Sequence, residues 1–257
     1  MSIFKLTIAY DGTGFVGWQR QAEGVSIQGL LEDACAALDG RPVAVAGAGR
    51  TDAGVHALGQ VASLVLERAI DAAAVVGALN VRLPPAVRVL EADTMLDGFH
   101  ARFSARRKSY RYRIANGPVL GPFERAYAWH VPAPVLDVGA MSEAARVLEG
   151  QHDFKAFQGT GSETHGTERV VYSARVAREG TGVVTIDLSG NGFLRHMVRN
   201  IVGTLVEVGR GRRPPDWVAE VLEAGDRALG GQTAPAAGLF LVSVEYDLAD
   251  ADTGSKI

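Results

Sequence analysis

The chain has a single cysteine, Cys35, among its 257 residues. One thiol cannot build an intramolecular disulfide framework or a thiolate cage for zinc. The six histidines show no close pairing of the kind that metal sites use, and no Gly-x-Ser-x-Gly motif offers a serine nucleophile. We therefore expect no bound metal and no disulfide-stabilised fold.

Long apolar runs are also missing. The nearest one, residues 72–81, is too short to span a bilayer, and the N-terminal residues lack the basic and apolar regions of a signal peptide. With 47% hydrophobic and 21% charged residues, the composition is that of an ordinary soluble globule. These features predict a cytoplasmic protein that does not associate with membranes.

A nucleotide cofactor is not expected either. Residues 12–17, Gly-Thr-Gly-Phe-Val-Gly, follow a predicted strand and match the spacing of the dinucleotide-binding fingerprint. That motif needs a helix to begin at once, so that the helix N-terminus can bind the pyrophosphate. Here residues 18–25 intervene before the expected helix cap at Ser26. We therefore expect no cofactor.

The net charge is −3, but the positive charges are clustered. The first cluster lies within residues 102–113, which contain no acid, and consists of Arg102, Arg106, Arg107, Lys108, Arg111 and Arg113. The second, opposed only by Glu207, consists of Arg195, Arg199, Arg210, Arg212 and Arg213. Because phosphate binding needs local positive potential rather than net charge, these clusters indicate a nucleic-acid partner.

Hydrophobic periodicity predicts the same order of elements twice. In the first half, strands are expected over residues 3–10, 42–46, 58–66 and 87–93, with helices beginning after the caps Ser26 and Asp71 and ending near Gly40 and Arg82. In the second half, strands are expected over residues 106–114, 169–178, 183–189 and 239–246, with helices over 138–148, 192–208 and 216–224. The pattern predicts an α+β protein with two ferredoxin-like β-α-β-β-α-β halves, residues 1–105 and 106–257.

The connection between two predicted strands, residues 47–56, reads Gly-Ala-Gly-Arg-Thr-Asp-Ala-Gly-Val-His. Asp52 in such a glycine-rich segment is commonly a turn former whose carboxylate binds nearby backbone N–H groups. The alternative is an acid held beside the base Arg50 where glycines leave room for another molecule. The segment alone leaves both interpretations open.

Two further segments carry candidate functional residues. On a strand over residues 106–113, Tyr110 and Tyr112 share one face and arginines share the other, which suits RNA but also describes an edge strand with two core tyrosines. In the predicted helix from residue 192, Arg195 and Arg199 are one turn apart beside an apolar stripe. Arg199 lies deeper in that stripe, where a cation needs a partner carboxylate unless it extends its head to solvent.

Together, these segments resemble the TruA-type family of tRNA pseudouridine synthases. The resemblance covers essentially the whole chain, and the segment Gly-Arg-Thr-Asp-Ala-Gly-Val-His is highly specific for it. The matching segments are residues 9–13, 17–19, 49–56, 99–105, 110–112, 196–203 and 238–239.

The resemblance implies a pseudouridine-synthase fold with a central cleft and a homodimer that isomerises uridine to pseudouridine at positions 38, 39 and 40 of the tRNA anticodon stem-loop. It assigns Asp52 as the catalytic aspartate, Tyr110 as the ring that stacks on the target base, and Arg199 as the cation that pairs with the aspartate. Arg50 resembles the arginine that helps to hold the target nucleotide out of its stem. Further RNA contacts are expected from His100, Arg102, Arg106, Arg107, Lys108 and Arg111.

These residue types fit the reaction. The carboxylate has to be ionised, and an adjacent arginine favours its charged form. Attack at C1′, attack at C6, and proton abstraction that leads to a glycal all remain open as routes. Two other functions also remain open: a synthase that acts on other RNA positions, and a non-catalytic RNA-binding or chaperone protein.

Overall fold

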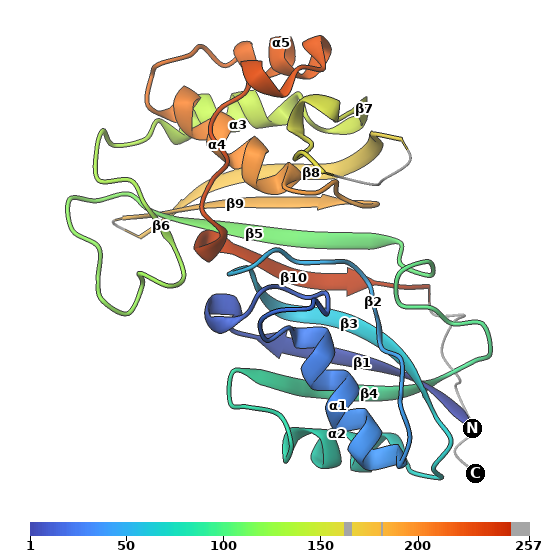
Figure 1. Ribbon diagram of the computed structural model, residues 1–257. Coiled ribbons are helices and arrows are strands. Elements are labelled where there is room, and N and C mark those ends of the chain that lie inside the picture. Colours follow the sequence, from blue (N-terminus) through green and yellow to red (C-terminus); the bar gives the residue numbers. More distant parts are fainter. Residues whose placement is uncertain (162–165, 181, 248–257) are drawn as a thin grey trace. The chain divides into compact units, whose positions relative to one another are not determined.

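The computed structural model describes residues 1–161, 166–180 and 182–247, and the chain divides into two compact units. Unit 1 comprises Met1–Arg106 with the described residues from Leu241 on, and unit 2 comprises Arg107–Phe240. Each unit combines mainly antiparallel strands with helices (Figure 1), so the predicted α+β fold class is confirmed. The C-terminal segment from Leu241 belongs to unit 1 because its strand lies next to a strand of that unit.

Unit 1 has the predicted order of elements. Its strands are β1 (Ser2–Tyr10), β2 (Ala46–Gly47), β3 (His56–Leu66), β4 (Val87–Met95) and β10 (Leu239–Glu245, which enters the unit at Leu241). β1 pairs antiparallel with both β3 and β4, while β2 pairs with one side of β3 and β10 lies next to β3. Side chains alternate between buried and half-buried along β1, which places Phe4, Leu6 and Ile8 in the core.

The helices of unit 1 begin and end as their capping residues predict. The Ser26 side chain accepts a hydrogen bond from the Gly29 N–H at the start of α1 (Ile27–Asp39), and Gly40 ends that helix in the left-handed conformation. The Asp71 side chain caps α2 (Ala72–Asn80) through the Ala74 N–H. A short 3-10 helix, η1 (Gly12–Gly14), follows β1, so no α-helix begins at residues 12–17.

Unit 2 is built on a sheet with the strand order β5-β9-β8-β7. Its strands are β5 (Arg107–Ala115), β6 (Trp129–His130, parallel to β5), β7 (Gly150–Asp153), β8 (Glu168–Glu179) and β9 (Val183–Gly190). Its helices are α3 (Val138–Arg146), α4 (Met197–Gly209), α5 (Trp217–Ala224) and the short 3-10 helices η2 (Lys155–Phe157), η3 (Arg227–Leu229) and η4 (Ala236–Gly238). α3 packs on β8 and α4, and α5 contacts both helices (Figure 1).

Two predicted elements differ from the structure. The run 42–46 is not a full strand, since only Ala46 and Gly47 pair with β3, although Val43 and Val45 are buried in the core. The helix expected from residue 192 begins only at Met197, because His196 has a backbone φ of 60° and no α-helix passes through that conformation. Arg195 therefore precedes the helix instead of lying one helical turn before Arg199.

Candidate active site

Asp52 lies in the connection between β2 and β3 of unit 1, at the first position of a tight turn. The Asp52 carbonyl accepts a hydrogen bond from the Val55 N–H (3.1 Å), and Gly54 has a φ of 78°. A type II turn requires a positive φ at its third residue, which explains the glycine there. A backbone hydrogen bond thus closes the turn, and the half-buried Asp52 side chain stands at its start.

A buried polar network lies next to this turn. The hydroxyls of Tyr10 and Thr51 are 2.8 Å apart, and Gln60 Nε2 donates to the Gly49 carbonyl (2.9 Å) and lies 3.4 Å from the Tyr10 hydroxyl. Tyr10, Thr51 and Gln60 are all buried. Burial raises the pKa of Tyr10 to about 12, so its hydroxyl stays protonated and available as a donor. The network fixes the residues on both sides of Arg50.

The chain after β1 braces the same turn from a second direction. The Trp18 N–H donates to the Thr51 carbonyl (3.0 Å), and the Trp18 ring is buried. Gly17 has a φ of 103°, and a Cβ at this position would lie 2.6 Å from the Thr51 carbonyl oxygen. Only glycine permits this approach. The Gly-Trp pair in the sequence is therefore explained as a support for the Asp52 turn.

The end of the loop is also held. His56 is buried, and its Nδ1 accepts a hydrogen bond from the Gly12 N–H (3.0 Å). At Gly12, a Cβ would overlap the Val55 carbonyl group. Sequence patterns assigned no role to Tyr10, Gln60 or Gly12. Spacing alone could not have assigned one, because the segment of Tyr10 and Gly12 meets Gln60 and residues 49–56 only in the folded unit.

Tyr110 lies on β5 of unit 2, opposite Leu188 of β9. Its side chain is buried, and its ring meets the Phe193 ring edge-on with 5.1 Å between centroids. Two residues further along the strand, Tyr112 is fully buried and its hydroxyl donates to the Pro235 carbonyl (2.7 Å). Tyr112 is therefore a core residue, while Tyr110 keeps a little exposed surface.

Arg199 lies in the first turn of α4 and is tied to one residue of another segment. Its Nε donates to the Ala234 carbonyl (2.7 Å), and the Ala234 N–H donates to the Arg199 carbonyl (3.1 Å). The segment Gly230–Gly238, which we call the strap, runs along α4 at this point. The strap also contacts Tyr112 through Pro235, so it connects β5, which carries Tyr112, to α4, which carries Arg199.

Asn200 holds the strap in place through its side chain. Sequence patterns assigned no role to this residue. Its side chain is buried; Nδ2 donates to the Phe157 carbonyl (2.8 Å), and Oδ1 accepts from the hydroxyl of Thr233 (2.6 Å) and from Arg227 Nη2 (3.1 Å). Glycines allow the close approach, because a Cβ at Gly203 would overlap the Gln232 carbonyl. The identity of residues 200 and 203 thus follows from the packing of the strap.

Most of the residues of unit 1 that are predicted to contact RNA expose their charged side chains. Arg50, Arg102 and Arg106 are exposed, and His100 is half-buried. Arg106 also forms an ion pair with Asp247, with 2.8 Å between Nε and Oδ2.

The predicted RNA contacts in unit 2 lie on β5. Arg107 is exposed, its guanidinium stacks 4.9 Å from the Tyr172 ring centroid, and Lys108 is half-buried. Arg111 differs, since its Nε and Nη2 donate to the two oxygens of Asp187 (2.7 and 3.0 Å). This bidentate pair occupies the face of Arg111 that a phosphate would use.

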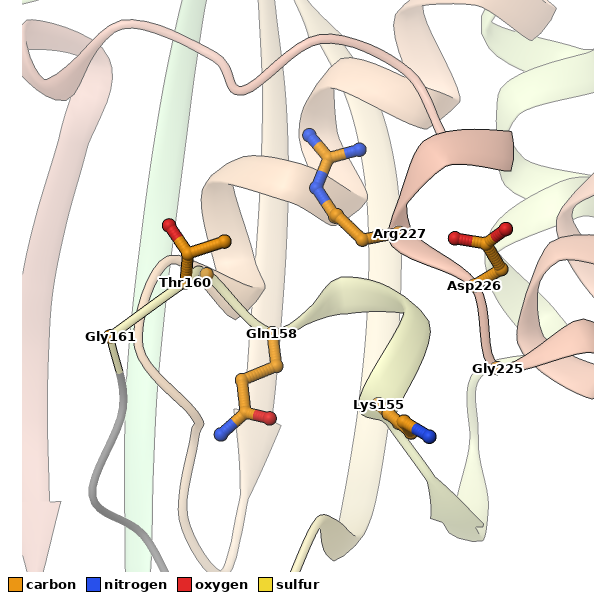
Figure 2. Close-up of a pocket in the computed structure, with 8 residues that line it drawn as sticks. Lys155, Gln158, Thr160, Gly161, Gly225, Asp226 and Arg227 are labelled. Atoms are coloured by element: carbon orange, nitrogen blue, oxygen red, sulfur yellow. The ribbon is translucent and has the colours of Figure 1, made fainter.

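A depression of about 320 Å³ lies between η2 and η3 of unit 2 (Figure 2). Its lining includes the cations Lys155 and Arg227. Figure 2 shows the Lys155 ammonium and the Arg227 guanidinium pointing in different directions, and Arg227 is directed to Asn200 and Thr233. The two charges do not converge on one point, so the depression is not arranged as a phosphate site.

Within the described ranges, no group of three or more His, Cys, Asp or Glu side chains is placed to hold a metal ion. In the same residues, no helix is both long enough and apolar enough to cross a membrane.

Comparison with known proteins identifies the family of this chain. A family model described as tRNA pseudouridine synthase matches residues 6–104 and 144–247 of the chain. The chain belongs to the tRNA pseudouridine synthase family. The matched ranges include the Asp52 turn of unit 1 and the α4 helix and strap of unit 2, but not Tyr110.

Individual relatives in the tRNA pseudouridine synthase family extend over nearly the whole chain. A protein of Syntrophotalea carbinolica named tRNA pseudouridine synthase A is 47% identical over 99% of this chain and 100% of its own length. Proteins of the same name from Myxococcus xanthus and Moorella thermoacetica are 47% and 46% identical, each over 96% of this chain and over 92% and 100% of their own lengths. The family resemblance expected from the sequence is confirmed.

Proposed function

We propose that this chain isomerises uridine to pseudouridine in tRNA, at positions 38, 39 and 40 of the anticodon stem-loop. The activity is supported by membership of the tRNA pseudouridine synthase family and by relatives of that name that match nearly the full length of this chain. The three positions are supported by the resemblance to the TruA-type family, whose members act there.

Asp52 is the proposed catalytic carboxylate. In the reaction, the N1–C1′ bond breaks, a C5–C1′ bond forms, the C5 proton leaves and N1 gains a proton. The atoms therefore balance within the nucleotide and water, and no oxidant or reductant is consumed. An ionised carboxylate serves each of the three routes, by attack at C1′ or C6 or by taking a proton. The braced turn supports this role, because a catalytic group acts best when its geometry is fixed before the substrate arrives.

Arg199 and Tyr110 complete the proposed catalytic set. A guanidinium next to Asp52 would hold the carboxylate in its charged form. The hydrogen bond from Arg199 Nε to the strap would fix the orientation of that planar guanidinium. The Tyr110 ring would stack on the target uracil, which has to leave its stem to be reached. These roles require that the Asp52 turn, Tyr110 and Arg199 meet the same nucleotide.

The residues proposed to contact RNA should contribute unequally to tRNA binding. Arg50 would hold the extruded nucleotide, and His100, Arg102, Arg106, Arg107 and Lys108 would contact the tRNA around it. Arg111 would contribute least, because Asp187 already binds its guanidinium. The proposal also includes a homodimer, in line with the TruA-type resemblance, and a cytoplasmic location, where tRNA is present.

The experiment is a map of pseudouridine in tRNA transcripts after incubation with the protein. Carbodiimide treatment followed by primer extension marks each pseudouridine as a stop. We expect stops at positions 38, 39 and 40, and none in matched transcripts with cytidine at those positions. Stops only at other positions would indicate a synthase of different site specificity. Binding of tRNA without any stop would indicate a non-catalytic RNA-binding protein.

A further inference from the structure

Phe103 is an exposed aromatic side chain in unit 1. It lies in one of the segments that match the family, but the proposed function assigns it no role. It is 75% exposed, although a phenylalanine side chain gains free energy when it is buried. Single exposed apolar residues are common and need no special reason. Phe103 differs from such residues in what surrounds its ring and in how its backbone is held.

The ring has an imidazole and a guanidinium beside it. The centroids of His100 and Phe103 are 4.4 Å apart with 35° between the ring planes, and the Arg102 guanidinium carbon is 5.6 Å from the Phe103 centroid. Arg102 has no carboxylate within 4.0 Å in the described part of the chain. The cluster therefore combines a largely exposed aromatic ring with a positive charge that no described carboxylate neutralises.

The backbone that presents this cluster is fixed. The His100 carbonyl accepts from the Ser104 N–H (2.9 Å), and the Ser104 hydroxyl accepts from the His100 N–H (3.2 Å), which closes the turn from both ends. The His100 Nδ1 accepts from the Arg102 N–H (3.1 Å). Because Nδ1 is an acceptor, the neutral ring carries its proton on Nε2.

The middle of the turn is anchored to the core of the unit. Ala101 is fully buried; its N–H donates to the Ser63 hydroxyl of β3 (3.0 Å), and its carbonyl accepts from the Tyr246 hydroxyl (2.7 Å). These two hydrogen bonds hold the backbone of the turn, while three of its side chains are exposed or half-buried. The turn therefore presents those side chains on a rigid backbone. We call the residues His100, Arg102 and Phe103 the aromatic platform.

From this arrangement, we infer that the aromatic platform binds an unpaired base of the tRNA substrate, with the base stacked on the Phe103 ring and the Arg102 guanidinium paired with the adjoining phosphate. Aromatic rings bind unstacked bases of any sequence, and a rigid ring loses little conformational entropy on binding. An arginine next to the ring adds a phosphate contact. The inference rests on the proposed function for the identity of the RNA, but its test does not need the reaction.

The test measures the dissociation constant of a fluorescein-labelled tRNA transcript by anisotropy over a series of salt concentrations. Phe103→Ala should weaken binding roughly tenfold while leaving the slope of log Kd against log salt unchanged, because a stacked base carries no counterion. Phe103→Leu should weaken binding similarly, and Phe103→Trp should restore it. Arg102→Ala should weaken binding and reduce the slope by about one ion.

Phe123→Ala is the matched control, because Phe123 is 90% exposed in unit 2 and forms none of these ring contacts. Equal affinity of Phe103→Ala and wild type would overturn the inference, as would rescue by Leu, which keeps the apolar volume without a π-face. A shift in oligomeric state on size exclusion with unchanged tRNA affinity would also overturn it, in favour of a protein contact. Wild-type protein that binds tRNA but forms no pseudouridine would defeat the proposed function alone.

Discussion

The side chain of Arg199 and the backbone of Ala234 form a reciprocal pair. Arg199 Nε donates to the Ala234 carbonyl, and the Ala234 N–H donates to the Arg199 carbonyl. The strap that carries Ala234 is held by Asn200 on one side and by Tyr112 on the other. The orientation of the proposed catalytic arginine is therefore set by a segment about 35 residues away in the sequence.

Arg199→Lys tests whether this orientation matters. The lysine keeps the positive charge, but its ammonium cannot hold the Ala234 carbonyl and also present a planar fork. We expect kcat for pseudouridine formation to fall about 100-fold, which is the scale of loss for a small misplacement of a catalytic group. The midpoint of thermal unfolding should stay close to that of wild type. Arg175→Lys, at an exposed arginine of β8, is the control and should retain full kcat. Wild-type kcat in Arg199→Lys would mean that charge alone is sufficient.

Gly203→Ala tests the packing of the strap. A Cβ at Gly203 would overlap the Gln232 carbonyl, so the strap or the helix has to move. We expect a loss of about 2–3 kcal/mol in the free energy of unfolding, typical of overpacking, together with a reduced kcat. Gly77→Ala is the matched control, because Gly77 lies in α2 with no atom of another segment within 4 Å of the point where a Cβ would lie, and it should gain up to about 1 kcal/mol. Urea denaturation of both variants measures the difference; equal effects would contradict the packing argument.

The stability of the protein should fall steeply in alkali. Burial raises the pKa of Tyr10 to about 12 and that of Cys35 to about 12, and it raises the pKa values of Tyr112 and Tyr246 further. A raised pKa means that the unfolded chain loses its protons first, so stability is full below the unfolded pKa values and declines from about pH 9–10 upwards.

Tyr10→Phe isolates one of these groups. It removes a proton that the unfolded state releases near pH 10, so the decline between pH 10 and 12 should become shallower by up to about 1.4 kcal/mol per pH unit. Free energies of unfolding measured by urea titration at each pH check this slope. A variant with the same slope as wild type would show that the pKa of Tyr10 does not differ between the folded and unfolded states.

The sequence predicted much of the architecture because the relevant signals are local. Caps at Ser26 and Asp71, alternation along β1 and β5, and the antiparallel pairing of β8 with β9, which are close in the sequence, each depend on neighbouring residues. The segment with Asp52 was recognised in the same way. These features need no knowledge of the rest of the fold.

The features that the sequence did not predict depend on contacts between distant segments. The start of α4 is set by His196, whose ring packs against Gly159, and a Cβ at Gly159 would lie 2.6 Å from the His196 ring. The run at residues 42–46 is apolar enough for a strand, but its side chains are buried while most of its backbone does not pair with β3. The roles of Asn200 and of the Tyr10–Thr51–Gln60 network become visible only when separate segments meet.

Asp52→Asn is the decisive variant, because it asks whether Asp52 is the catalytic group. Pseudouridine formation frees the hydrogen at C5, so release of tritium from tRNA whose uridines are tritiated at C5 counts each event. We expect the rate for Asp52→Asn to fall on the order of 10⁴-fold or more, the scale seen when a catalytic group is removed, with tRNA affinity nearly unchanged. Asp97→Asn, at an exposed aspartate outside the turn, should match wild type. Tritium release by Asp52→Asn at the wild-type rate would show that Asp52 is not the catalytic group.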